Sequence, residues 1–157
     1  MTDIYFYSRK NNNYGWLSNF WRSLQKVDNI SYKTNEHYYQ SMKAKSSEDQ
    51  EWIADASTPY GAMKAGRNLR KKDMIDDWDI KKVSIMRYGL LCKFLQNKDL
   101  KEKLLQTGDA NLHEDSPTDM FWGVKGKDML GKLLMEIRED IRKHWMGSKN
   151  GNISSNI

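Results

Sequence analysis

Three side chains able to take part in acid, base or nucleophilic chemistry are spaced for one face of a helix: Glu36, Gln40 and Lys43. At about 100° per residue these positions fall within a sector of roughly 60°, so the carboxylate, amide and amine can enter a single cavity. A carboxylate and an amine in one cavity can transfer protons or attack an electrophilic carbon. The alternative is a solvated helix face, because charged residues mostly stay in water.

A second carboxylate, Asp119, follows the polar residues 116–118 and precedes Phe121, Trp122 and Gly123. A carboxylate beside aromatic residues and a glycine suits the edge of a pocket. Pro117 and Gly123 also suit an ordinary turn, in which Asp119 would act only as a turn former.

Trp78 stands between two aspartates, Asp77 and Asp79, instead of within an apolar stripe. We expect Trp78 to stack on a base or another planar ring, and Asp79 to cap a helix that begins near Ile80. The alternative is that Trp78 is a large core residue.

Several other chemistries lack sequence support. The three histidines have no metal-ligand spacing, so no metal and no cofactor are predicted. Serine-hydrolase, dinucleotide-binding and Walker motifs are also missing. The single Cys92 excludes an intramolecular disulfide and favours a cytoplasmic location. No apolar stretch reaches signal-peptide or membrane-span length, so no membrane association is expected.

Length and charge limit the remaining possibilities. The chain has 157 residues, which fits one domain, predicted over 1–146 with a flexible Gly-, Ser- and Asn-rich tail over 147–157. Its formal net charge of +5 favours anionic partners such as nucleotides or nucleic acid. The densest basic cluster either contacts phosphate or forms a solvated helix end; it comprises Lys64, Arg67, Arg70, Lys71 and Lys72.

The elements that must position these residues follow from local patterns. Strands are predicted over 4–7, 27–32 and 111–114. Ser47 with Gln50 indicates a capping box, and Thr58 with Pro59 indicates another helix start. Three- and four-residue apolar spacing over 83–94 and 130–145 predicts two long helices with buried stripes. The aromatic loop over 11–21 is expected to pack beside the site. The fold class is therefore α+β: a single compact, mostly helical domain with a small β-sheet.

Taken in order, the motifs resemble those of the NADAR family, also called YbiA-like. The resemblance covers nearly the whole chain and rests on residues 15–20, Glu36-x3-Gln40-x2-Lys43-Ala44, Thr58-Pro59, Gly66-Arg67, residues 77–79 and 86–94, Ser116-Pro117-x-Asp119-x2-Trp122-Gly123, and Leu130-Gly131-x2-Leu134-Met135-x-Ile137-Arg138. One departure is Asp128, where the family often has Asn, which puts a ligand or structural contact there in question.

The resemblance implies a YbiA-like fold and an N-glycosidase that hydrolyses the bond between ribose C1 and a nitrogen. The implied substrates are riboflavin-biosynthesis ribosylaminopyrimidine intermediates or ADP-ribose on guanine of nucleic acid, the latter being ADP-ribosylation reversal. Glu36, Trp78 and Asp119 are carried over as site residues, and Lys43 is implied as a nucleophile that forms a Schiff base.

On this basis Glu36 is expected to act as acid and base, and Asp119 to hold a ribose hydroxyl or stabilise the developing cation. The expected substrate-binding residues are Gly15, Asn19, Gln40, Arg67, Trp122 and Gly123. The competing class is a non-catalytic module that binds ADP-ribose or another nucleotide in the same pocket.

Overall fold

The computed structural model describes residues 2–8 and 13–154, with side chains described as far as His144. The chain forms two compact units. The helical unit comprises residues 7–100, and the terminal unit comprises residues 1–6 and 101–157. The boundary between them falls within helix α5 (Lys98–Gln106). That residues 1–146 fold as one domain stays a prediction.

Four α-helices form most of the helical unit: α1 (Asn35–Ser41), α2 (Ser47–Ala54), α3 (Pro59–Arg67) and α4 (Trp78–Gln96). The first three begin after a hydroxyl N-cap whose oxygen accepts a hydrogen bond from a backbone N–H of the first turn. The predicted cap at Thr58 is confirmed. The cap of α2 is Ser46 and not Ser47, because the Ser46 hydroxyl accepts from the N–H of Asp49 at 3.1 Å.

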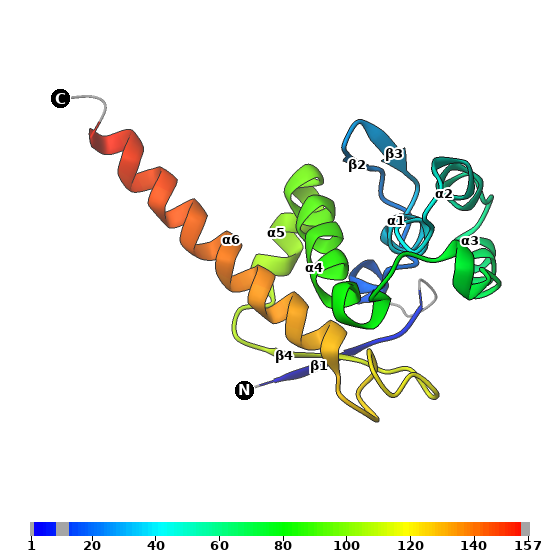
Figure 1. Ribbon diagram of the computed structural model, residues 1–157. Helices are drawn as coiled ribbons and strands as arrows, with labels where there is room; N and C mark the ends of the chain where they lie inside the picture. Colours follow the sequence, from blue (N-terminus) through cyan, green and yellow to red (C-terminus); the bar gives the residue numbers. More distant parts are fainter. Residues whose placement is uncertain (1, 9–12, 155–157) are drawn as a thin grey trace. The chain divides into compact units, whose positions relative to one another are not determined.

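Helix α1 contacts α2, α3, α4 and the strand β3 (Ile30–Tyr32) within the helical unit (Figure 1). All seven of its residues are buried. Close packing of α4 on α1 requires Gly89, because a Cβ there would lie 2.4 Å from Oδ1 of Asn35 and from the ring of Tyr38. Polar side chains on so buried a helix must find hydrogen-bond partners within the protein.

The predicted strand over 27–32 is wrong as a single strand. Its residues belong to an antiparallel hairpin of β2 (Gln25–Val27) and β3 (Ile30–Tyr32). The turn residues Asp28 and Asn29 have φ values of 51° and 68°, which is the left-handed conformation of a two-residue hairpin turn. Asp and Asn tolerate this conformation better than most residues, so the turn lies inside the stretch predicted to be extended.

Short 3₁₀ helices occupy two connections of the helical unit. The aromatic loop contains η1 (Gly15–Leu17), while Asn11 and Asn12 of that predicted loop lie outside the described residues. The second, η2 (Lys71–Asp73), lies between α3 and α4. The predicted stripe of α4 is confirmed for Met86, Leu90 and Phe94, which are buried, while Val83, its first predicted member, is only partly buried.

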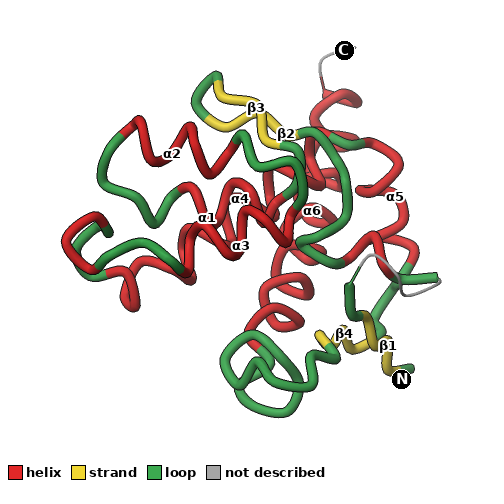
Figure 2. The backbone as a smooth tube through the Cα atoms, turned by 90° about the vertical axis from the view of Figure 1, so that its right-hand side faces the viewer, coloured by secondary structure: helices red, strands yellow, loops and turns green. Residues whose placement is uncertain are grey.

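The terminal unit joins the two ends of the chain through a parallel ladder. Strand β1 (Asp3–Phe6) pairs in parallel with β4 (Asn111–Glu114), and α6 (Met129–Ser154) packs on β4. A Cβ at Gly131 would lie 2.0 Å from the carbonyl oxygen of Leu112, so glycine permits this approach of helix to strand. Figure 2 shows the segment from β4 to α6 as a loop without helix or strand.

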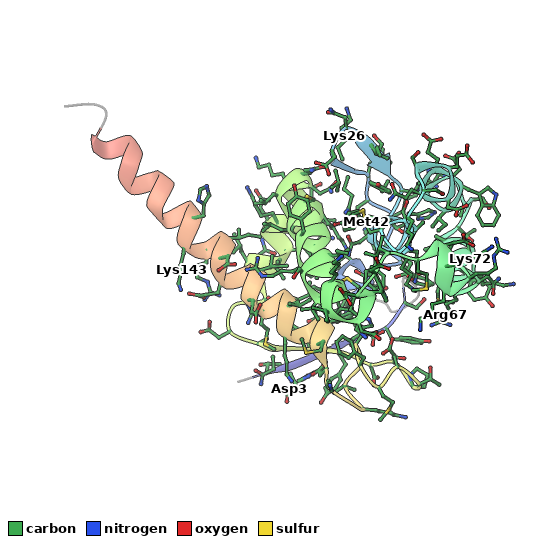
Figure 3. The ribbon with its side chains drawn as sticks, in the orientation of Figure 1. Asp3, Lys26, Met42, Arg67, Lys72 and Lys143 are labelled. Carbon is green, nitrogen blue, oxygen red and sulfur yellow. The ribbon has the colours of Figure 1, made fainter. Side chains whose placement is uncertain are left out.

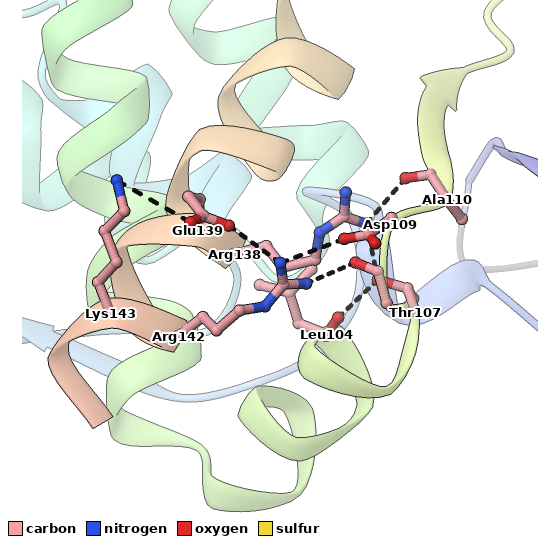
Figure 4. Close-up of polar contacts among 9 residues, drawn as sticks. Leu104, Thr107, Asp109, Ala110, Arg138, Glu139, Arg142 and Lys143 are labelled. Carbon is pink, nitrogen blue, oxygen red and sulfur yellow. Dashed lines mark hydrogen bonds and ion pairs between the residues drawn. The ribbon is translucent and has the colours of Figure 1, made fainter. Parts of the chain in front are cut away.

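Two arginines of α6 bind the turn after α5 (Figure 4). Nη1 of Arg138, a buried side chain, donates to the carbonyl of Ala110 at 2.8 Å and to Oγ1 of Thr107 at 2.9 Å. Nη2 of Arg142 donates to the carbonyl of Gly108 at 2.7 Å. These contacts satisfy main-chain acceptors at the point where the chain turns towards β4.

The predicted apolar stripe of the last helix is confirmed by the burial of Leu130, Leu133, Leu134, Ile137 and Ile141. The side chain of Trp145, its last predicted member, lies outside the described residues. The backbone of α6 is helical to Ser154, so the predicted tail is helical for most of its length, and its flexibility stays a prediction.

The α+β, mostly helical class is confirmed. Its strands form two separate two-stranded ladders and not one small sheet, because β1 pairs only with β4 and β2 only with β3 among the described residues. In the described part of the chain, no helix combines the length and apolar composition that a bilayer span requires.

Candidate functional site

Helix α1 places the carboxylate of Glu36 and the amide of Gln40 one turn apart in a buried setting. Their residues are 7% and 4% exposed. Nε2 of Gln40 donates to Oε1 of Glu36 at 2.7 Å, which fixes the carboxylate in one orientation. The structure thus joins the first two of the three residues that sequence spacing selected.

Lys43 lies just beyond α1, because the helix ends at Ser41. Its backbone N–H donates to the carbonyl of Gln40 at 3.2 Å, so the chain still turns in the helical sense at this point. Burial lowers the pKa of the Lys43 amine below the ordinary lysine value. The Glu36 carboxylate acts in the opposite direction, because a nearby negative charge favours the protonated amine.

Two aromatic rings lie beside the Lys43 amine. Nζ of Lys43 is 5.8 Å from the ring centroid of Tyr39 and 5.6 Å from that of Trp78. The two ring centroids are 5.1 Å apart. The sequence pattern does not single out Tyr39, although its position four residues before Lys43 places the two side chains on the same side of the chain. The rings provide flat apolar surfaces next to the amine.

Trp78 reaches this position because α4 begins at Trp78 itself. The predicted start near Ile80 with Asp79 as cap is wrong, since Asp77 is the N-cap residue and has a left-handed φ of 58°. Asp79 lies in the first turn and forms an ion pair with Lys82 at 3.3 Å. Because Asp77 turns the chain at this point, the half-buried Trp78 is the first residue of α4.

All five residues of the predicted basic cluster are exposed. Arg67 ends α3, and its positive charge lowers the pKa of Lys43. Arg70 is neutralised by Asp73 at 2.9 Å. Figure 3 labels Arg67 and Lys72 near α3, at the edge of the helical unit. Of the five residues in this cluster, Arg67 is therefore the one whose charge affects the pKa of Lys43.

Gly15 and Asn19 are buried and belong to the loop that leads into β2. Oδ1 of Asn19 accepts from Nδ2 of Asn35 at 2.8 Å, and its Nδ2 lies 3.4 Å from Sδ of Met86. The carbonyl of Asn19 accepts from the N–H of Glu36 at 3.1 Å. Both ends of the Asn19 amide thus have protein partners, and its main chain contacts the first turn of α1.

Asp119, Trp122 and Gly123 belong to the terminal unit, in the loop between β4 and α6. Oδ1 of Asp119 accepts from the backbone N–H groups of Phe121 at 3.0 Å and Trp122 at 2.8 Å. The ring of Trp122 meets that of Phe121 edge-on at 4.8 Å. A Cβ at Gly123 would lie 2.5 Å from the carbonyl oxygen of Asp119, so the turn requires a glycine there. Asp119 is therefore a turn former, and its ribose-binding role stays a prediction.

Asp128, the departure from the family pattern, makes a structural contact. It has a left-handed φ of 52° and lies immediately before α6. Its Oδ2 is 2.6 Å from Nδ1 of His113, whose Nε2 is 3.2 Å from Oδ1 of Asp3. Burial alone lowers the pKa of His113, but the two carboxylates outweigh it and the pKa is raised.

Within the described residues, no group of three or more His, Cys, Asp and Glu side chains is arranged to hold a metal ion. The site residues that the structure brings together are Glu36, Gln40, Lys43, Tyr39 and Trp78. This arrangement combines a buried carboxylate with an amine of lowered pKa, two groups whose chemistry suits proton transfer and nucleophilic attack.

Comparison with known proteins gives a consistent assignment. The model of the NADAR domain matches residues 5–142. N-glycosidase Npun_R5314 of Nostoc punctiforme is 42% identical over 146 residues, covering 88% of this chain and 92% of that protein. N-glycosidase YbiA of Escherichia coli K12 is 40% identical over 144 residues, covering 89% of each.

Two further matches extend the comparison. Riboflavin biosynthesis protein VVA0006 of Vibrio vulnificus is 37% identical over 145 residues, which cover 90% of this chain but 39% of that protein. The NMR structure of E. coli YbiA matches with a TM-score of 0.84 and 38% identity, over 92% of this chain and 88% of that one.

Proposed function

This chain belongs to the NADAR domain family, and from that membership and the geometry of the site we infer that it is an N-glycosidase, a hydrolase that acts on N-glycosyl compounds. The observation that carries the catalytic assignment is the buried Glu36 carboxylate, held by Gln40 at 2.7 Å on the helix that leads to Lys43, whose amine lies next to two aromatic rings. A helix buried along its length rarely retains a carboxylate without a use for it.

Hydrolysis of a ribose C1–N bond needs a proton for the leaving nitrogen and compensation for positive charge at C1. We assign the proton transfer to Glu36, which gives a proton as the bond breaks and takes one from water afterwards. Gln40 holds the carboxylate in place through its 2.7 Å hydrogen bond. The released sugar, which keeps its phosphate or ADP group, and the free nitrogen compound are the products, with one water consumed.

Lys43 is assigned to attack on ribose C1. Its neutral amine replaces the leaving nitrogen at C1, the ring oxygen takes a proton as the sugar opens, and water then hydrolyses the resulting Schiff base. The lowered pKa supports this role, because only an unprotonated amine is a nucleophile. Trp78 and Tyr39 provide surfaces for the planar heterocycle or the sugar.

The remaining site residues have supporting assignments. We assign Asp119 to a ribose hydroxyl or to the cationic intermediate, with Trp122 and Gly123 beside it, as the family resemblance implies. Arg67 is assigned to substrate phosphate, supported by its exposure and its position at the end of α3. Gly15 and Asn19 are assigned to the ribose end through main-chain groups of their loop.

For the substrate, two N-ribosides fit this chemistry. The first is a ribosylaminopyrimidine phosphate of riboflavin biosynthesis, supported by the name of the Vibrio vulnificus relative. The second is ADP-ribose attached to guanine of nucleic acid, favoured by the exposed cations Lys64, Arg67, Lys71 and Lys72. A cytoplasmic location, proposed from the single cysteine, suits either substrate.

The test is mass spectrometry of products after incubation with each substrate separately. The variants are Glu36→Gln and, as a matched control on an exposed position of α2, Glu51→Gln. We expect Glu36→Gln to lower kcat by about 10²- to 10⁴-fold while substrate binding is retained, and Glu51→Gln to match the wild type. Borohydride added during turnover should attach the sugar to Lys43.

The competing function is a non-catalytic module that binds ADP-ribose. It would bind the nucleotide without releasing product from either substrate, and Glu36→Gln would change nothing but affinity. The buried acid and amine disfavour it, since a binder needs donors for phosphate but no proton-transfer group.

A further inference from the structure

Lys93 is a second buried lysine of the helical unit, and the reaction above does not use it. It lies in α4 and is 0% exposed. Its Nζ donates to the carbonyl of Trp16 at 2.8 Å and to the carbonyl of Ser18 at 2.9 Å. The partners of this amine in the described part of the chain are main-chain carbonyls and not a carboxylate.

Such a lysine is costly to bury. Burial lowers the pKa of Lys93 to about 7, which shows how strongly this environment disfavours the charged amine. A methionine or leucine would fill a similar volume without this cost. The two hydrogen bonds from Lys93 offset this cost. They satisfy the carbonyls of Trp16 and Ser18, which would otherwise be buried without donors.

The loop held by Lys93 also contacts α1, the helix that carries Glu36. Trp16 and Ser18 are followed by Asn19, whose carbonyl accepts from the N–H of Glu36 at 3.1 Å. The side chain of Asn19 also accepts from Asn35, the first residue of α1, at 2.8 Å. The loop therefore contacts the first turn of α1 through both main chain and side chain.

The Asn35 side chain is fixed from its other side as well. Its Oδ1 accepts from Nε2 of Gln25 at 3.0 Å, and the same Nε2 donates to the carbonyl of Gly89 at 3.2 Å. Gly89 and Lys93 are one turn apart on α4. Helix α4 thus holds the start of α1 at two points, through Gly89 and through the loop.

We propose that Lys93 is a positioning residue for the N-glycosidase reaction: it fixes the 16–19 main chain, which in turn fixes the first turn of α1 and the carboxylate of Glu36. The expected effect on kcat rests on the proposed function, whereas the positioning of the first turn of α1 by Lys93 does not. Lys93 itself is too buried to touch a substrate.

The test compares Lys93→Met with Arg138→Met. Methionine removes the donors but keeps the apolar stem. Arg138 is the matched control, because it is also a buried cation that donates to a main-chain carbonyl, that of Ala110 in the terminal unit (Figure 4). Both variants should lose thermal stability. Kinetics are measured well below both unfolding temperatures.

We expect Lys93→Met to lower kcat about 10- to 100-fold with KM changed less than about threefold, since small misplacements of a reacting group cost this much. Hydrogen exchange of the Glu36 amide should accelerate in Lys93→Met and not in Arg138→Met. Lys93→Arg, which retains donors for both carbonyls, should restore part of kcat. If Lys93→Met does not fold, Lys93→Leu, which also lacks donors, replaces it under the same criteria.

Unchanged kcat and unchanged Glu36 exchange in Lys93→Met would overturn the proposal, as would an equal loss of kcat in Arg138→Met. If the wild type cleaves no N-riboside, the proposed function fails, while the exchange of the Glu36 amide still decides whether Lys93 positions this turn. The two failures are therefore distinguishable.

Discussion

Nε2 of Gln40 lies 2.7 Å from Oε1 of Glu36, one turn away along the buried helix α1. This hydrogen bond gives a donor to one oxygen of a carboxylate that burial would otherwise leave costly. Oε1 of Gln40 is buried without a hydrogen-bond partner among the described residues. The amide orientation is thus set by Glu36, and the two side chains act as one unit.

Replacing Gln40 by Leu should lower kcat about tenfold or more, because the Glu36 carboxylate loses the donor that orients it. Steady-state kinetics on the cleaved N-riboside check this. Gln96→Leu is the control, since Gln96 binds the Lys26 main chain of β2 and does not touch α1. Equal losses in the two variants would contradict an orienting role for Gln40.

The hydrogen bond between Gln40 and Glu36 should require a glycine at position 66. A Cβ there would lie 2.0 Å from Oε1 of Gln40, so Gly66→Ala must displace the amide from Glu36. We expect a loss of about 1–3 kcal/mol in unfolding free energy and a fall in kcat. Gly61→Ala, on the same helix α3, meets its nearest atom at 3.2 Å and should be close to neutral. Denaturant unfolding and steady-state kinetics of both variants test this prediction. A kcat equal to that of the wild type in Gly66→Ala would contradict the requirement for glycine.

Charged residues around Lys43 should change the pKa of its amine, and with it the fraction of amine that is unprotonated and reactive. Burial is the main cause of its lowered pKa, Glu36 raises the pKa, and Arg67 lowers it. Arg67→Gln should therefore raise the pKa of Lys43, and Glu36→Gln should lower it. The measurement is the pH dependence of reductive trapping of an aldehyde at Lys43. Arg70→Gln, whose charge is already balanced by Asp73, should leave the trapping profile unchanged.

The His113 contacts should make stability depend on pH. The folded-state pKa of His113 is raised by Asp128 and Asp3, so its stabilising contribution is complete below its unfolded pKa of about 6.5. That contribution is lost as pH rises through the folded-state pKa. Denaturant unfolding of the wild type at pH 6 and pH 8.5 should show this decrease.

Asp128→Asn is the matched variant for this effect. Asparagine accepts the left-handed φ of 52° and can still accept a hydrogen bond, but it removes the charge. Its unfolding free energy should change less between the two pH values than that of the wild type. An undiminished change would assign the pH dependence to other groups.

Much of the helical part of this fold can be predicted from sequence because its causes are local. The cap at Thr58 followed by Pro59, and the apolar spacing from Met86 to Phe94, act within one or two turns and are confirmed. The spacing of Glu36 and Gln40 likewise requires only a helix to bring them together. Boundaries that depend on left-handed residues, Asp28 with Asn29 and Asp77, were placed wrongly, since several residue types tolerate that conformation.

The sequence by itself therefore determined the helical pattern, the family and the carboxylate, amide and amine of the site. The tertiary structure decided which main-chain groups those residues meet: Lys93 binds the carbonyls of Trp16 and Ser18, and Asn19 binds α1 instead of facing solvent. The physical reason is that every residue carries the same carbonyl and N–H groups. Sequence cannot distinguish which carbonyl a buried amine will reach when the two are more than seventy residues apart, and only long-range packing selects it.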